Sequence, residues 1–278
     1  MADSDLAPSA PAPNSVAPWG PRNPQDAVVV AKPVAPPAPR LRVNGLVVGA
    51  LSTLALAVWI GLVAGPLAAL AIVGGVFVHE FGHVMVINWA GSGPSSIRII
   101  PFFGGAATMR RPPESDFKGV LIALAGPAFG LVAAAPFVIA AYVTHERSWV
   151  VGAFWVGSLN LINLAPAAPL DGAKAIGPAL ARIHPLLERA VLVLIAVLAL
   201  GWAIQRGSLI FAGFIALGAL RAFAAAAPRA AARPLTADEW VAGVALYVAT
   251  VSLCVAVTVW AAGAGGIRLA IPFLGARA

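Results

Sequence analysis

The sequence predicts an all-α polytopic membrane protein with six to seven transmembrane helices and a small β-hairpin-like loop between the second and the third. Of its 278 residues, 60% are hydrophobic and only 10% are charged, and the mean hydropathy is +0.89. Soluble domains carry about 25% charged residues, and a chain that is disordered throughout needs low hydrophobicity. Both classes are therefore excluded. The single cysteine also excludes a disulfide framework and a cysteine-rich metal site.

Seven apolar runs are long enough to cross a bilayer, which takes about 20 residues. We expect spans near residues 44–64, 66–89, 119–142, 149–170, 187–205, 208–227 and 240–262. Between the second and third, residues 96–109 carry β-branched and aromatic side chains around Gly104 and Gly105, a pattern typical of a hairpin.

Residues 1–42 differ from the rest, because they hold ten of the 24 prolines and are rich in alanine. Proline at this density interrupts both helices and strands, so we expect a disordered tail. Basic residues then set the orientation, since cytoplasmic loops are enriched in lysine and arginine. They cluster before the first span, in the 90–118 loop and around the 171–186 loop, so we expect these three segments and the N-terminus in the cytosol.

The formal charge of +7 comes mainly from basic residues in the loops that we expect in the cytosol, so it indicates membrane topology. We therefore expect contact with membrane lipid and no nucleic-acid partner. The high alanine and arginine content indicates a bacterial genome rich in G and C. We therefore expect a multi-pass protein of a bacterial cytoplasmic membrane. The sequence leaves the oligomeric state open.

Residues 79–83, His-Glu-Phe-Gly-His, place polar and charged groups inside the second apolar run. A charge at the centre of a membrane helix costs about 2.5–3.5 kcal/mol on insertion scales, so such residues are functional candidates. His79 and His83 lie one turn apart on the same helix face, where two imidazoles can chelate one metal, and Glu80 can reach a metal-bound water. The alternative is a hydrogen-bonded pair of helix histidines with Glu80 as their partner.

A hydrolytic zinc site needs a third protein ligand and an open position. Cys254 stands alone in the last span, and His145 and His184 lie in loops. Asp171 is the remaining candidate, because it ends an apolar run on the same expected cytosolic side as the two histidines. Taken without them, Asp171 also fits an N-cap or turn residue.

The chain resembles the site-2 intramembrane metalloproteases in three stretches. The first is residues 79–83, and the second is residues 163–172, Asn-Leu-Ala-Pro-Ala-Ala-Pro-Leu-Asp-Gly, which is similar to the family's N-x-x-P-x-x-P-L-D-G segment. The third, weaker stretch joins Gly104-Gly105 with Ala125-Gly126-Pro127. One departure is Gly130, where the family often has asparagine three residues after this Gly-Pro.

The resemblance implies one Zn²⁺ per chain, held by His79, His83 and Asp171, with Glu80 as the general base. It also implies that Asn163 polarises the scissile carbonyl or holds the oxyanion. The strand at Gly104-Gly105 would hold an extended substrate.

The implied activity is that of a zinc metalloendopeptidase that hydrolyses peptide bonds in or near transmembrane segments of membrane-protein substrates, as in regulated intramembrane proteolysis. Residues 43–175 would form the catalytic membrane core, and 176–278 additional transmembrane helices with a short C-terminal tail. The alternative is a non-hydrolytic metal-binding membrane protein or transporter. A transporter predicts further polar residues along a path across the membrane, and the spans after residue 186 have few.

Overall fold

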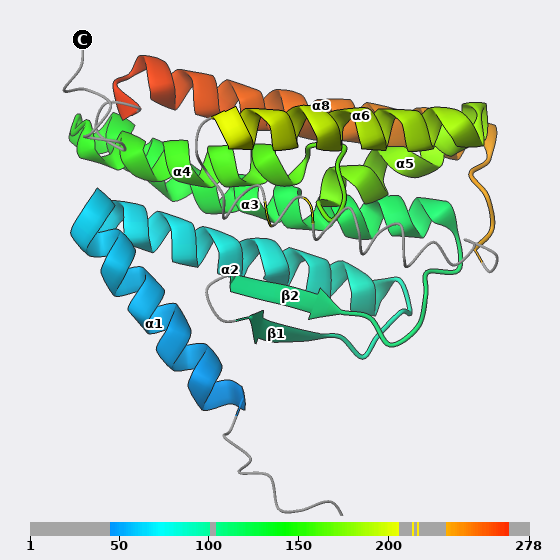
Figure 1. Cartoon of the computed structure of the whole chain (residues 1–278). Helices are drawn as coiled ribbons and strands as arrows, with labels where there is room; N and C mark the ends of the chain where they lie inside the picture. The colour runs from blue at the N-terminus through cyan, green and yellow to red at the C-terminus, as the bar shows by residue number, and fades with distance from the viewer. Residues whose placement is uncertain (1–44, 101–103, 206–212, 214–215, 217–231, 267–278) are drawn as a thin grey trace, which may run out of the picture. The chain divides into compact units, whose positions relative to one another are not determined.

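The computed structural model describes residues 45–100, 104–205, 213, 216 and 232–266, and it is mainly helical (Figure 1). The elements are α1 (Gly45–Ala64), α2 (Pro66–Trp89), β1 (Ser96–Ile100), β2 (Gly104–Thr108), α3 (Asp116–Thr144), α4 (Ser148–Asn163), α5 (Asp171–Ile183), α6 (Pro185–Gln205) and α8 (Ala237–Gly263). The predicted spans near 44–64, 66–89, 119–142, 187–205 and 240–262 each correspond to one helix. The predicted span 208–227 lies almost wholly outside the described residues.

Four of the described helices are long and apolar enough to cross a membrane: α1, α2, α3 and α8. Their large apolar side chains are widely exposed, including Leu62 on α1, Val143 on α3 and Val259 on α8. Such exposure is rare on the surface of a soluble monomer, whereas lipid satisfies it. The chain is therefore a multi-pass membrane protein, with a predicted total of six to seven crossings.

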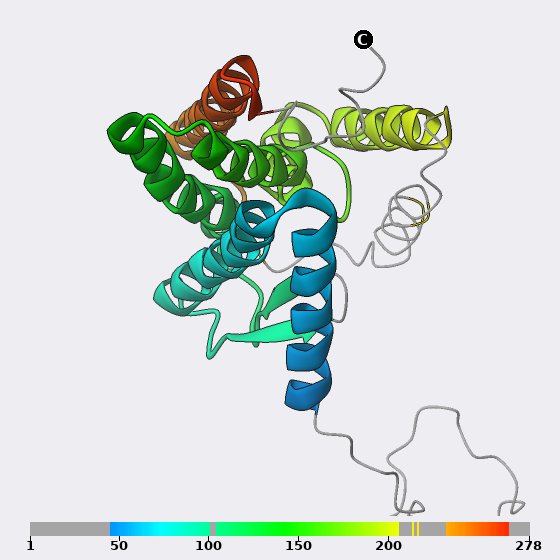
Figure 2. The ribbon, with the colours of Figure 1, turned by 90° about the vertical axis from the view of Figure 1, so that its left-hand side faces the viewer.

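The core forms where α2 packs against α3 and α4, and where α8 packs against α3 and α4 in turn. Small residues allow the close approach: a Cβ on Gly82 would lie 2.5 Å from the Ala125 carbonyl oxygen and 2.8 Å from the Phe129 Cβ. Close packing through small residues is the usual way in which membrane helices associate. In the view of Figure 2, α6 lies apart from this bundle, and it packs against α5.

The predicted hairpin is present as two antiparallel strands, with Ser96 paired to Thr108 and Ile100 paired to Gly104. Strand β2 packs against α2, the helix that carries the His-Glu-Phe-Gly-His sequence (Figure 1). Ala107, near the end of this strand, reaches Glu80 of that sequence.

The prediction of one continuous span over 149–170 is wrong for its last residues, 164–170. Helix α4 ends at Asn163, and a new helix, α5, begins at Asp171. Pro166 and Pro169 explain the break, because proline lacks the backbone N–H and clashes with the preceding turn of a helix. Asp171 thus begins a helix rather than ending one. The expected 171–186 loop is largely the helix α5.

Two connections fix the start of α8. The Arg233 backbone N–H donates to the Glu114 carbonyl, and the Asp116 N–H donates to the Arg233 carbonyl, each at 2.9 Å. Thr236 then opens α8 with a capping box, in which its side chain accepts from the Glu239 N–H. The beginnings of α3 and α8 therefore lie side by side, and the two helices run in the same direction.

Candidate metal centre

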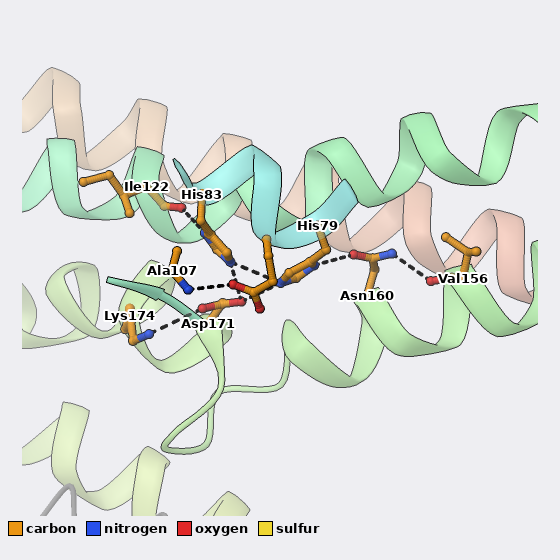
Figure 3. A network of polar contacts seen from close by, with 9 residues as sticks. His79, His83, Ala107, Ile122, Val156, Asn160, Asp171 and Lys174 are labelled. Atoms are coloured by element: carbon orange, nitrogen blue, oxygen red, sulfur yellow. Dashed lines mark hydrogen bonds and ion pairs between the residues drawn. The ribbon is translucent and has the colours of Figure 1, made fainter. Parts of the chain in front are cut away.

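Polar side chains of α2, α4 and α5 meet inside the bundle (Figure 3). His79 and His83 come from α2, and Asp171 from the first turn of α5. The three residues are buried, with 5%, 7% and 9% of their surface exposed. Buried ionisable groups inside an apolar bundle need partners, because water is not available to them.

The facing atoms form a nearly regular triangle. The His79 Nε2 and Asp171 Oδ2 atoms are 3.1 Å apart, as are His83 Nε2 and Asp171 Oδ2, and also the two histidine Nε2 atoms. Tetrahedral zinc with bonds of about 2.0–2.1 Å separates its ligand atoms by about 3.3 Å. Two imidazole nitrogens and a carboxylate oxygen are also a donor set that zinc favours. Both the size and the chemistry of this triangle therefore fit zinc.

No other group of three histidine, cysteine, aspartate or glutamate side chains in the described ranges could converge on a metal in this way. His145 follows the end of α3 and His184 follows the end of α5, while Cys254 is buried in α8. The structure thus brings together the three predicted ligands and leaves the rejected candidates elsewhere.

The other ring nitrogen of each histidine is also engaged. The His83 Nδ1 lies 2.7 Å from the Ile122 carbonyl oxygen on α3, and the His79 Nδ1 lies 2.9 Å from Asn160 Oδ1 on α4. A metal-bound histidine usually donates its second N–H to a carbonyl or carboxylate, which fixes the ring and the tautomer. Both rings therefore present Nε2 to the triangle.

Asp171 has a third contact, because the Lys174 ammonium lies 3.5 Å from its Oδ1. A positive charge beside a carboxyl group favours its ionised form, which is the form in which an aspartate binds a metal.

Glu80 lies next to His79 but faces the hairpin. Its Oε2 accepts the Ala107 backbone N–H at 2.9 Å. This differs from the alternative in which Glu80 would serve as the hydrogen-bond partner of the histidines. The contact orients one carboxylate oxygen and leaves a second that can take a proton.

Gly126 makes room for the centre. A Cβ at this position would lie 2.6 Å from the His79 Nε2 and would clash with the His83 Nε2. The Ala-Gly-Pro sequence of α3 is thereby explained, because only glycine lets α3 face the ligand atoms.

The two asparagines of α4 have different surroundings. Asn163 is the last residue of α4 and is partly buried, outside the hydrogen-bonded network of the described residues. Asn160 is 2% exposed and contacts His79 directly. Asn160 is not among the residues predicted from the sequence, where its signal is a second asparagine inside the same apolar run.

Comparison with known proteins agrees with this chemistry. Residues 67–146 match the model of Peptidase family M50, the family of the site-2 proteases, which confirms the resemblance. The "Putative zinc metalloprotease Rip3" of Mycobacterium tuberculosis is 30% identical over 124 residues, which is 42% of this chain and 31% of that protein. The "Putative zinc metalloprotease sll0528" of a Synechocystis species is 32% identical over 119 residues, 40% of this chain and 31% of that protein.

The chain thus aligns with less than a third of the length of these relatives. No solved structure shows significant similarity to it. The matched segment 67–146 contains both histidines and Glu80 but not Asp171. In the structure, however, the Asp171 Oδ2 atom lies 3.1 Å from the Nε2 atoms of both histidines.

Proposed function

We propose that this M50-family chain is a zinc-dependent intramembrane endopeptidase. The observation that carries the proposal is the buried triangle of His79, His83 and Asp171, with Glu80 beside it, among helices that can cross a membrane. His79, His83 and Asp171 would hold one Zn²⁺. When bound, zinc acts as a Lewis acid that lowers the pKa of water and polarises a carbonyl.

Glu80 is the proposed general base. It takes a proton from the attacking water as the water oxygen bonds to the scissile carbonyl carbon. It then gives that proton to the amide nitrogen as the C–N bond breaks, so a carboxylic acid and an amine are formed. Asn163 is the proposed group that stabilises the oxyanion, because it is the last residue of α4, just before the break.

The substrate we propose is the transmembrane segment of another membrane protein. A membrane helix hides its peptide bonds in internal hydrogen bonds, so the substrate must unwind before it is cut. The hairpin lies against Glu80 through Ala107, which supports β2 as the place where an unwound segment is held. The irregular segment 164–170 supports a water path, since irregular backbone at membrane depth is tolerated where it lines a cavity.

We further propose that the site opens to the cytosol, with the N-terminus on the same side, in a bacterial cytoplasmic membrane. The tail 1–42 would be cytosolic, residues 43–175 would supply the catalytic core, and 176–278 the additional helices. The excess of basic residues around the 90–118 and 171–186 segments supports this orientation.

Replacing Glu80 with glutamine tests the reaction. We expect Glu80→Gln to keep zinc, because Glu80 is not a ligand, and to lower cleavage of a membrane-anchored reporter by at least about 100-fold, since general-base groups contribute about 10²–10⁴-fold. Metal content is measured by elemental analysis, and cleavage in proteoliposomes. Glu146→Gln, an exposed change after the far end of α3, is the matched control and should cleave normally.

Cleavage by Glu80→Gln at the normal rate would exclude the base role. The alternative function, metal transport without hydrolysis, makes the opposite prediction. It requires uptake of zinc into the proteoliposomes and no zinc-dependent cleavage by the unmodified chain.

A further inference from the structure

The amide of Asn160 is the buried polar group of the centre that the proposed reaction leaves unexplained. It lies in α4, two helices along the chain from the histidines, and its side chain is almost wholly shielded from solvent. An unpaired amide at membrane depth is strongly unfavourable, so the partners of this amide indicate its role.

Both ends of the amide are engaged, and this fixes its orientation. The Nδ2 donates to the Val156 carbonyl oxygen at 2.7 Å, and the Oδ1 lies 2.9 Å from the His79 Nδ1 (Figure 3). A carbonyl oxygen can only accept, so the Asn160 NH₂ must face Val156 and the oxygen must face His79.

The orientation of Asn160 sets the state of His79. Because the Asn160 oxygen can only accept, the proton of the neutral imidazole must sit on Nδ1. The lone pair then lies on Nε2, the atom 3.1 Å from Asp171 Oδ2 and 3.1 Å from the His83 Nε2. We propose that Asn160 is a positioning residue that holds the His79 ring and its tautomer ready for zinc.

His83 is held in the same way by the Ile122 backbone carbonyl, which no side-chain replacement removes. Asn160 is therefore the support that mutation can test. It depends in turn on Gly130 of α3, because a Cβ there would clash with the amide oxygen, nitrogen and carbon of Asn160. Asn160 on α4 makes the contact with His79, and Gly130 on α3 leaves the space that this contact needs.

This proposal rests on the proposed zinc site, and the test separates the two. Zinc affinity of the purified full-length chain is measured by competition with a chromophoric chelator. We expect Asn160→Leu, which has a similar shape, to weaken zinc binding by about 10–100-fold, the usual effect of losing such a support. The absorption spectrum of the cobalt-substituted protein should also change, because the His79 ring is no longer fixed.

Two further variants keep the test informative if Asn160→Leu folds poorly. Asn160→Asp keeps an acceptor for the His79 N–H and should stay within a few-fold of the unmodified affinity. Gly130→Ala keeps the Asn160 side chain but pushes its amide away from His79, and should resemble Asn160→Leu. Thr250→Val is the matched control, because it removes another buried hydrogen bond, the one from Thr250 Oγ1 to the Leu246 carbonyl in α8, without touching the centre. Its zinc affinity should be unchanged.

Unchanged zinc affinity and cobalt spectrum in Asn160→Leu, while His79→Ala abolishes binding, would overturn the positioning role and leave the zinc site standing. Equal losses in Asn160→Asp and Asn160→Leu would also overturn it, because the acceptor would then not matter. If His79→Ala itself binds zinc normally, the proposed zinc site fails, and this inference fails with it.

Discussion

Gly126 shows how one residue without a side chain decides whether the centre can exist. Its Cα faces the two imidazole nitrogens that would bind the metal, at a distance where a methyl group does not fit. A helix interior disfavours glycine by about 1 kcal/mol relative to alanine, so its presence in α3 needs a reason of this kind.

We therefore expect Gly126→Ala to bind zinc at least about 10-fold more weakly, because the added methyl group displaces the two histidine ligands. Losing the groups that orient metal ligands weakens metal binding by at least about this much. Gly74→Ala is the matched control. It lies on the same helix as the histidines, its added Cβ would meet no atom within 4 Å, and it should bind zinc normally. Zinc stoichiometry after gel filtration measures both. A Gly126→Ala protein with one full equivalent of tightly bound zinc would contradict this steric explanation.

At the scale of elements, the break between α4 and α5 is the feature that places Asp171, and α8 supports it. The Tyr247 hydroxyl donates to the Leu164 carbonyl at 2.7 Å, and the Trp240 Nε1 donates to the Ala179 carbonyl at 3.0 Å. Leu164 is the first residue after α4, so its carbonyl has no partner in a further helical turn. The last helix thus satisfies a backbone group that the break exposes.

Tyr247→Phe removes only the hydroxyl, and we expect it to destabilise the protein by about 1–3 kcal/mol, the cost of leaving a buried acceptor unpaired. Thermal unfolding in detergent measures this change, and zinc affinity should fall as the Asp171 segment loosens. Tyr142→Phe is the control, because Tyr142 is exposed and stacks on Trp260 at the far end of α3. Equal stability of the two variants would show that α8 does not support the break.

Much of the arrangement could be predicted from the sequence, and the exceptions have physical reasons. Long apolar runs predict membrane helices because about 20 residues span a bilayer, and the spacing of His79 and His83 predicts a shared face because the helix repeats every 3.6 residues. The contact of Asn160 with His79 could not be predicted, since the two residues are 81 positions apart in the chain and the contact depends on the space at Gly130. The end of α4 at Asn163 was not predicted, because the span 149–170 was drawn from its apolar composition and not from the helix-breaking effect of Pro166 and Pro169.

At the scale of the whole molecule, the backbone pairing of Arg233 with Glu114 and Asp116 puts the beginnings of α3 and α8 on one side of the membrane. The far ends of these helices also meet, since Tyr142 stacks on Trp260 with ring centroids 5.8 Å apart. The two helices therefore cross in parallel.

Single cysteines in a background without Cys254 test this arrangement. We expect Glu114→Cys and Asp238→Cys to react with a membrane-impermeant thiol reagent only in inverted vesicles, and Glu146→Cys only in intact cells. All three positions are exposed, so accessibility to the reagent depends on the side of the membrane. Reaction of positions 114 and 238 from opposite sides would contradict the parallel arrangement.

The pairing of Arg233 with the 114–116 segment is joined by two contacts to α5. The Arg182 side chain donates to the Leu235 carbonyl, and the Trp240 indole N–H donates to the Ala179 carbonyl. The start of α3, the end of α5 and the start of α8 therefore share one end of the bundle. With α1, α2, α3, α4 and α8 as the predicted crossings, we expect the remaining crossings, after α5 and before α8, to be even in number, so this arrangement favours seven crossings over six.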